Sequence, residues 1–212
     1  MGGEGLDPPT SENGHASIAF HRTFLQIGLP IKTARRMNLE TMLRQRIQEV
    51  PDFPIPGVNF KDITPIFLDP ELMRQTAEAL AAPWMKKGIT RVVGIESRGF
   101  LFGPQVAQLL NAGFVIVRKV GKLPPETSSI TYSLEYGNAT IEMAKGSVGK
   151  GDAVLIHDDL LATGGTASAS ATLAGQLGAT VCGYSFMIEL GFLGGRKLLS
   201  RQGLPVEAII QY

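Results

Sequence analysis

Hydrophobic positions follow helical or strand periodicity from residue 37 onward, whereas those before it do not. The first periodic segment predicts a helix over 37–50, because its apolar residues recur at helical spacing: Leu39, Met42, Leu43, Ile47 and Val50. Residues 1–36 mix glycine, proline and polar residues with a short apolar run, and they show neither a clean signal peptide nor a helix. We therefore expect 37–212 to form the folded domain and 1–36 to be an extension outside its core.

Beyond residue 50 the pattern alternates between strands and helices. Strand-like runs occur at 91–95, 114–117, 131–136, 139–143, 153–157, 181–188 and 206–210. Helical patterns occur at 70–87, 99–111, 166–177 and 193–199. Gly137-Asn138 signals a hairpin turn, and the polar, proline-rich segment 119–129 predicts a mobile loop. Alternating elements with Val/Ile-rich strands indicate an α/β fold with a mostly parallel central sheet flanked by helices.

Composition narrows the class of protein. The chain has 212 residues, of which 44% are hydrophobic and 18% charged, as expected for a single globular domain. A formal net charge of +1 gives no basic surface for nucleic acid or membranes. The lone cysteine, Cys182, cannot form an internal disulfide and suits a reducing, cytoplasmic setting. The longest uncharged stretch, 160–188, is studded with glycine and polar residues, so we expect no membrane span.

The most informative segment is an apolar strand that ends in two carboxylates and continues into a glycine turn and a helix. Asp158 and Asp159 follow the strand at 153–157, and the turn Thr163-Gly164-Gly165-Thr166 precedes the helix. Backbone N–H groups of such a turn bind phosphate, and the helix N-terminus favours negative charge. The acids would repel that phosphate, so we expect them to accept hydrogen bonds from ribose hydroxyls or to face a cation.

Other nucleotide motifs do not fit this turn. The Walker A ending Gly-Lys-Ser/Thr and the dinucleotide pattern Gly-x-Gly-x-x-Gly are both absent from it. An isolated Thr-Gly-Gly-Thr would more often be a plain helix-start turn. The two preceding acids favour a sugar-phosphate ligand instead.

The strand, Asp-Asp pair and Ala-Thr-Gly-Gly-Thr turn resemble the phosphoribosyl-pyrophosphate (PRPP) loop of type I phosphoribosyltransferases. Four further segments occur in the same order as in the adenine phosphoribosyltransferase family, around Phe53 to Ile63, Glu96 to Phe100, Arg118 to Pro124 and Tyr132 to Gly137. The resemblance covers about 39–212. It implies a type I phosphoribosyltransferase fold with a small hood and a flexible catalytic loop. It also implies a pentosyltransferase of purine salvage that converts adenine and PRPP into AMP and pyrophosphate with Mg²⁺.

The resemblance also implies the residues of the site. PRPP and AMP would contact Ser97, Arg98, Arg118, Lys119, Lys122, Tyr136, Asp158, Asp159, Ala162, Thr163, Gly164, Gly165 and Thr166. Adenine would stack on Phe60, with backbone groups of Asn59 and Lys61 reading its edge and their side chains tolerant of change. Mg²⁺ would bind through PRPP with Asp158 and Asp159 nearby, and a cis peptide is implied near Glu96-Ser97.

Four of the site residues are expected to act in catalysis: Arg98, Lys122, Glu135 and Asp159. Arg98 and Lys122 would stabilise the leaving pyrophosphate, Asp159 the ribose, and Glu135 would transfer a proton near the purine imidazole. Each has a plainer interpretation, since a lone Arg or Lys is usually a solvated charge, a lone Glu in a strand usually faces water, and Phe60 alone would be a core aromatic.

Two alternatives to an adenine transferase stay open at this stage. One is a transferase for guanine or hypoxanthine, and the other is a non-catalytic, PRPP-sensing regulator on the same scaffold. A homodimer is implied by the family, and the apolar face near Phe100 to Leu110 is compatible with it.

Overall fold

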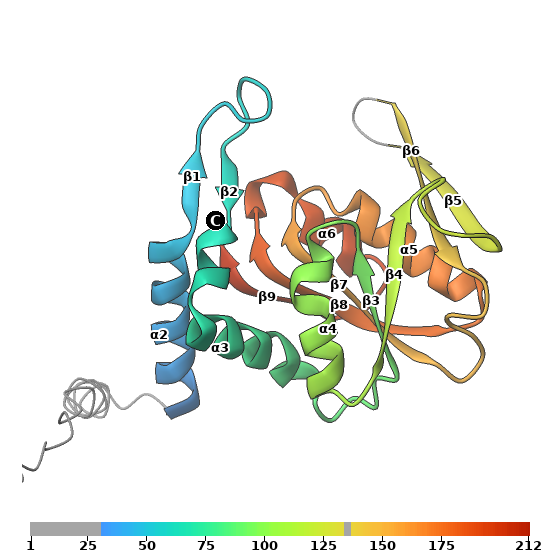
Figure 1. The fold of residues 1–212 in the computed structure, drawn as a ribbon, viewed down its shortest axis with the longest axis horizontal. Helices are drawn as coiled ribbons and strands as arrows, with labels where there is room; N and C mark the ends of the chain where they lie inside the picture. The colour runs from blue at the N-terminus through green and yellow to red at the C-terminus, as the bar shows by residue number, and fades with distance from the viewer. Residues whose placement is uncertain (1–30, 134–136) are drawn as a thin grey trace, which may run out of the picture.

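The computed structural model describes residues 31–133 and 137–212, and it describes side chains from residue 38 onward. Seven strands form one sheet in the order β5-β6-β4-β3-β7-β8-β9 (Figure 1). Five of them run parallel: β4 (Gly113–Lys119), β3 (Arg91–Ile95), β7 (Ala153–Leu161), β8 (Thr180–Glu189) and β9 (Val206–Gln211). β5 (Thr127–Ser133) and β6 (Asn138–Ala144) form an antiparallel hairpin that joins the edge of β4. The α/β fold with a mostly parallel sheet is confirmed.

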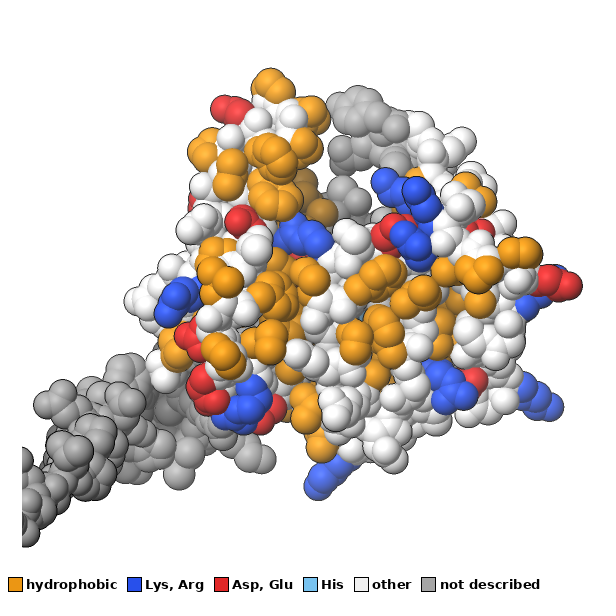
Figure 2. Space-filling model, in the orientation of Figure 1, with side chains coloured by type: hydrophobic (Ala, Val, Ile, Leu, Met, Phe, Trp, Pro, Cys, Tyr) orange, Lys and Arg blue, Asp and Glu red, His pale blue; other side chains and the backbone are white. Residues whose placement is uncertain are grey.

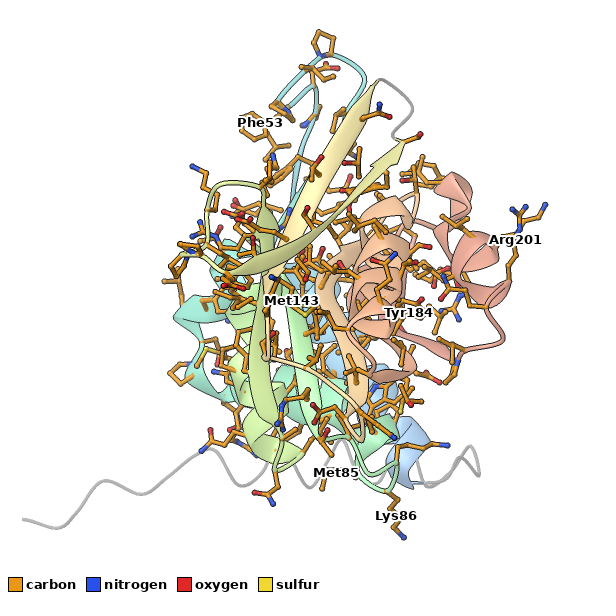
Figure 3. The ribbon with its side chains drawn as sticks, turned by 90° about the vertical axis from the view of Figure 1, so that its right-hand side faces the viewer. Phe53, Met85, Lys86, Met143, Tyr184 and Arg201 are labelled. Carbon is orange, nitrogen blue, oxygen red and sulfur yellow. The ribbon has the colours of Figure 1, made fainter. Side chains whose placement is uncertain are left out.

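Helices cover both faces of the sheet, because the central strands are apolar on both sides. One core lies between the sheet and α2 (Ile31–Arg46), α3 (Pro70–Ala81) and α4 (Gly99–Leu109), and it contains Trp84 and Phe102. The other lies between the sheet and α5 (Gly165–Gln176) and α6 (Gly195–Ser200). Met143 and Tyr184 are fully buried there (Figure 3). The described residues also form three short 3₁₀ helices: η1 (Thr64–Leu68), η2 (Ala82–Trp84) and η3 (Gly191–Leu193).

A small two-stranded sheet projects from the body as an arm, which corresponds to the expected hood. β1 (Gln48–Val50) pairs antiparallel with β2 (Phe60–Asp62) (Figure 1). Its exposed hydrophobic side chains are Val50, Phe53, Ile55 and Val58. Figure 2 shows a notch between this arm and the part of the molecule that carries β5 and β6, with lysine or arginine side chains at its base and far side. Figure 3 places Phe53 at this end of the molecule and Met85 and Lys86 at the opposite end.

Several element boundaries differ from the sequence-based predictions. The helix predicted to 50 ends at Arg46, and Val50 instead pairs with Phe60 in the arm. The hairpin turn at Gly137-Asn138 is wrong, since Asn138 already pairs with Ser133 in the ladder. Helix α2 begins at Ile31, six residues before the predicted domain start, so the boundary at 37 stays a prediction.

The chain order of the strands determines where a ligand site can lie. From β3 the chain passes through α4 to β4 on one side, and from β7 it passes through α5 to β8 on the other side. β3 and β7 are parallel neighbours, so their carboxyl ends meet at one edge of the sheet. Such a topological switch point is where ligands bind in open α/β sheets.

Helix α6 packs tightly against the chain that leaves β7. A Cβ built on Gly195 would lie 2.2 Å from the carbonyl oxygen of Ala162 and 2.8 Å from Leu161 Cδ1. Gly164, in the turn between β7 and α5, has φ +83°. Its carbonyl accepts the first helical hydrogen bond of α5. Gly195 therefore permits the close approach that holds the turn in place.

Replacing Gly195 by alanine tests this contact. We expect Gly195→Ala to lower the free energy of unfolding by roughly 1–3 kcal/mol, because the added methyl group forces backbone to move in a packed region. Chemical denaturation followed by circular dichroism measures the change.

Gly175 provides the matched control for that substitution. It lies on the exposed side of α5 with no atom within 4 Å of a built Cβ. Gly175→Ala should be neutral or stabilising by about 0.5–1 kcal/mol. Equal effects of the two substitutions would show that the approach of α6 does not constrain the turn.

A histidine is buried in the strand just before the acid pair. His157 is fully buried on β7, and its Nδ1 lies 3.0 Å from the carbonyl oxygen of Ser185. Nε2 has no hydrogen-bond partner among the described residues. Burial lowers the pKa of His157 to about 4, although the bond to Ser185 opposes the shift. The ring is therefore neutral near pH 7 and donates from Nδ1.

This histidine makes stability depend on pH. Its pKa is lower in the folded chain than in the unfolded chain, so its contribution is fully present above about pH 6.5 and is lost as the pH falls toward 4. We expect the unfolding free energy of the wild type, relative to that of His157→Val, to fall by about 3 kcal/mol between pH 7.5 and pH 4. A difference that stays constant over this range would contradict a neutral, buried imidazole.

Candidate active site

Two turns form the centre of the site at the carboxyl edge of the sheet. One, 96–98, follows β3 and leads into α4; the other, 162–164, follows β7 and leads into α5. The Glu96-Ser97 peptide is cis, as the resemblance implied. Ser97 is exposed at this turn, and its carbonyl accepts a hydrogen bond from the N–H of Phe100.

The acid pair lies inside β7 rather than after it. The ladder with β8 continues to Leu161, so the strand ends four residues later than the 153–157 predicted from the sequence. Asp159 is only 3% exposed, and Asp158 accepts a hydrogen bond from the Asp159 N–H at 2.9 Å. Asp159 Oδ2 lies 2.5 Å from Nη2 of Arg98.

The two acids differ in how readily they hold a charge. Burial raises the pKa of Asp158 well above its usual range, and the neighbouring Asp159 carboxylate raises it further. Burial also raises the pKa of Asp159, but the Arg98 guanidinium opposes this shift. Asp158 therefore takes up a proton more easily than Asp159.

The glycine turn after β7 encloses the hollow expected for a phosphate. It is lined by Asp158, Leu160, Leu161, Ala162, Thr163, Gly164, Gly165, Thr166, Ala167 and Phe186. No side chain caps α5, and its hydrogen-bond ladder starts only with the N–H of Ser168. The first N–H groups of the helix thus remain available for an anion.

Arg98 joins the acid pair to the arm. Besides its ion pair with Asp159, Arg98 donates through Nη2 to the carbonyl oxygen of Lys61 at 2.9 Å, and its guanidinium lies 4.9 Å from the ring centre of Phe60. The sequence suggested a pyrophosphate contact for this residue. That contact stays a prediction, and the structure shows Arg98 between the expected base-binding strand and the expected ribose-binding acids.

The expected pyrophosphate cations are arranged around a glutamate that sequence reasoning did not assign. Glu96 accepts from Nη2 of Arg118 at 2.7 Å and from the N–H of Lys119 at 3.0 Å. The hydrogen bond from Arg118 lowers the pKa of Glu96, and the same contact raises that of Arg118. The side chains of Lys119 and Lys122 are exposed. Glu96 therefore already balances part of the positive charge that the sequence predicts for the pyrophosphate.

A second glutamate, also missed, holds the loop that carries Lys122. Glu142 on β6 is 4% exposed, and its Oε1 accepts from the N–H groups of Lys122 and Leu123, both at 2.9 Å. Its Oε2 accepts from the hydroxyl of Thr127. The backbone hydrogen bonds, with that from Leu123 the strongest, lower the pKa of Glu142. The only sequence signal was a charged residue between two apolar positions of a strand, Ile141 and Met143.

The segment expected to bind the base is held by contacts of its side chains. Glu49 on β1 accepts from Asn59 at 2.8 Å and forms an ion pair with Lys61. Lys61 is 6% exposed, and its Nζ lies 4.3 Å from the ring centre of Tyr212. Phe60 is half-buried and meets Phe53 edge-on at 5.2 Å between ring centres.

Two expected site residues, Glu135 and Tyr136, lie outside the described residues. The other expected residues converge on the carboxyl edge from the ends of β3, β4 and β7 and from β2.

Within 38–133 and 137–212, no three His, Cys, Asp or Glu side chains are grouped so as to hold a metal ion. None of the helices in the described part of the chain has the length and apolarity needed to cross a membrane.

Comparisons with known proteins agree with this geometry. Residues 70–183 match the phosphoribosyl transferase domain. Adenine phosphoribosyltransferase from Sorangium cellulosum is 51% identical over 173 residues, covering 80% of this chain and 86% of its own. The crystal structure of the enzyme from Rhodothermus marinus is 51% identical and superposes with a TM-score of 0.79, over 83% of this chain and 99% of its own.

A more distant structure shows the same likeness. Adenine phosphoribosyltransferase from Saccharomyces cerevisiae, solved in complex with adenine and an imino-altritol bisphosphate, is 41% identical with a TM-score of 0.76, over 82% of this chain and 99% of its own. The domain match and the relatives at about 50% identity show the family of the chain. It belongs to the phosphoribosyltransferase family and, within it, to the adenine phosphoribosyltransferases.

Proposed function

We propose that the protein transfers the 5-phosphoribosyl group of PRPP to adenine, producing AMP and pyrophosphate in purine salvage. The observation that carries this proposal is the arrangement around Arg98. Its guanidinium joins Asp159 of the carboxylate pair to the aromatic strand, and the uncapped glycine turn follows the carboxylate pair along the chain. The turn, the carboxylate pair and the strand match a phosphate, a ribose and a flat base in that order.

The phosphoribosyl group is assigned to the β7–α5 turn. The 5-phosphate accepts from N–H groups at the start of α5 and from the hydroxyls of Thr163 and Thr166. Asp158 and Asp159 accept from the ribose 2- and 3-hydroxyls. Adenine stacks on Phe60, and the backbone of 59–61 reads its edge; the ion pair of Lys61 with Glu49 holds that backbone in place.

The reaction is a displacement at the anomeric carbon. A bond forms between a purine ring nitrogen and ribose C1 while the bond from C1 to the pyrophosphate oxygen breaks, and the purine loses its N–H proton. The charge of Asp159 stabilises the oxocarbenium-like ribose. Glu135 is our candidate acceptor for the proton, and Tyr136 our candidate contact to phosphate; both assignments rest on the family pattern.

The leaving pyrophosphate has two negatively charged phosphate groups, which the site must stabilise. Lys119 and Lys122 present exposed cations beside the turn at 96–98, and Arg118 reaches it through Glu96. Arg98 completes the cationic side of the site. A closed loop over 119–137 excludes water, which would otherwise hydrolyse the reactive ribose.

Mg²⁺ is proposed as the cofactor, because carboxylate and phosphate oxygens are the ligands it prefers. With only Asp158 and Asp159 nearby, the ion would take most of its ligands from the PRPP diphosphate. When bound it neutralises charge on the leaving group.

A homodimer and a cytoplasmic location are also proposed. Leu101 and Leu109 on α4 and Ile116 on β4 are each more than one-third exposed and offer an apolar surface for a second copy. The lone thiol of Cys182 suits a reducing compartment. Sedimentation of the purified protein at micromolar concentration measures whether it is a dimer.

The substrate assignment is tested with a panel of bases. We expect adenine with PRPP and Mg²⁺ to yield AMP and pyrophosphate, and guanine and hypoxanthine to react at least tenfold more slowly in kcat/KM. Faster turnover of guanine or hypoxanthine would make the protein a different purine transferase. Binding of PRPP with no turnover of any base would make it a regulator.

The role of the charged carboxylate is tested by Asp159→Asn. We expect kcat/KM to fall about 100-fold or more, since charge stabilisation at the ribose is lost in a site shielded from water. The fold should persist, because Asn removes a buried charge while Arg98, which is 27% exposed, keeps access to water and to the Lys61 carbonyl.

Glu78→Gln provides the control for that substitution. Glu78 is an ion-paired carboxylate on α3, remote from the carboxyl edge of the sheet. This variant should keep wild-type kcat/KM. Wild-type turnover by Asp159→Asn would remove the acid pair from the mechanism.

A further inference from the structure

A tyrosine on the β5–β6 hairpin contacts the phosphate turn and has no role in the mechanism above. The hydroxyl of Tyr132 lies 2.9 Å from Oγ1 of Thr166, the second residue of α5. Its ring atoms Cδ2 and Cε2 lie 3.7 Å from the position of a Cβ built on Gly165. Tyr132 is half-buried and packs against the core on the α5 side of the sheet. The hairpin thus reaches the start of the helix through one side chain.

The direction of this hydrogen bond matters for an anion. Each hydroxyl carries one hydrogen, and either can donate to the other. A phosphate oxygen only accepts, so Thr166 serves it by donating its single hydrogen outward. Thr166 Oγ1 then needs a donor on its other side, and the Tyr132 hydroxyl is at the right distance.

We propose that Tyr132 is a positioning residue for the phosphate site, which acts through Thr166. Its hydroxyl donates to Thr166 Oγ1 and so directs the Thr166 hydrogen toward the 5-phosphate of the ligand. This proposal rests on the proposed function, since it takes the turn as the 5-phosphate site. A chain of two hydroxyl donors ending on an anion is stronger than either bond alone, because each bond polarises the next.

The proposal predicts different effects on the binding of phosphorylated and unphosphorylated ligands. Tyr132 touches the part of the site that holds phosphate, whereas Phe60 and Lys61 lie on the separate two-stranded sheet of the arm (Figure 1). Loss of the Tyr132 hydroxyl should therefore weaken ribose 5-phosphate, AMP and PRPP and leave adenine unaffected. A purely structural role would lower stability without this selectivity.

The test compares Tyr132→Phe with the wild type. Phenylalanine keeps the ring against Gly165 and removes only the donor. By isothermal titration calorimetry we expect the Kd of ribose 5-phosphate and of AMP to rise about three- to tenfold, as for the loss of one hydrogen bond. The Kd of adenine should change less than twofold. In steady-state assays the KM for PRPP should rise by a similar factor while kcat stays within twofold.

Thr131→Val is the matched control. Thr131 neighbours Tyr132 on the same strand, and its hydroxyl bonds to that of Thr140 at 2.8 Å on the exposed face of the hairpin. This variant removes a hydroxyl pair of the same kind away from the phosphate turn, so all five measured constants should match the wild type.

Thr166→Val tests whether Tyr132 acts through Thr166. In a double-mutant cycle Tyr132→Phe should have no further effect on ribose 5-phosphate binding once Thr166 is valine, and this cycle also applies if Tyr132→Phe lowers the Tm. Unchanged ribose 5-phosphate binding by Tyr132→Phe, additive effects in the cycle, or an equal loss for adenine would overturn the proposal. Because ribose 5-phosphate binding needs neither adenine nor turnover, an inactive wild type would refute the proposed function alone.

Discussion

The contact between the Arg98 guanidinium and the Asp159 carboxylate connects the separate parts of this site. Asp159 is buried in the sheet, where a carboxylate alone would be costly, and Arg98 compensates its charge. Arg98 in turn binds the carbonyl of Lys61 and the face of Phe60. Arg98 thus provides a polar link between the arm and the switch point of the sheet, and it holds the expected base and ribose sites in register.

Three glutamates then position what surrounds that contact, and none of them is expected to touch substrate. Glu49 fixes the side chains of the strand expected to bind the base, Glu96 holds Arg118, and Glu142 holds the backbone at Lys122. Each acid accepts hydrogen bonds from groups that must point in one direction, and each has a lowered pKa because of them. The site is thus organised by acidic residues that bind its cationic residues through their side chains or backbone.

The sequence sufficed for the parts of the site that depend on local signals. Apolar runs identified β3 and β7, and glycines after Asp159 identified the turn into α5, because strand, turn and helix preferences act within a few residues. Glu142 and Gly195 were missed, because their partners lie far away in the chain: Lys122 is 20 residues from Glu142. Val50 was misassigned for the same reason, since its strand exists only through pairing with Phe60.

The most direct test of the account is a crystal structure of the protein with AMP. The account predicts the phosphate at the N-terminus of α5, within hydrogen-bond distance of the N–H groups at Gly165 and Thr166. It also predicts the ribose hydroxyls on Asp158 and Asp159, and the adenine ring on Phe60. A phosphate bound elsewhere, with the turn at 162–166 closed to it, would contradict the central claim.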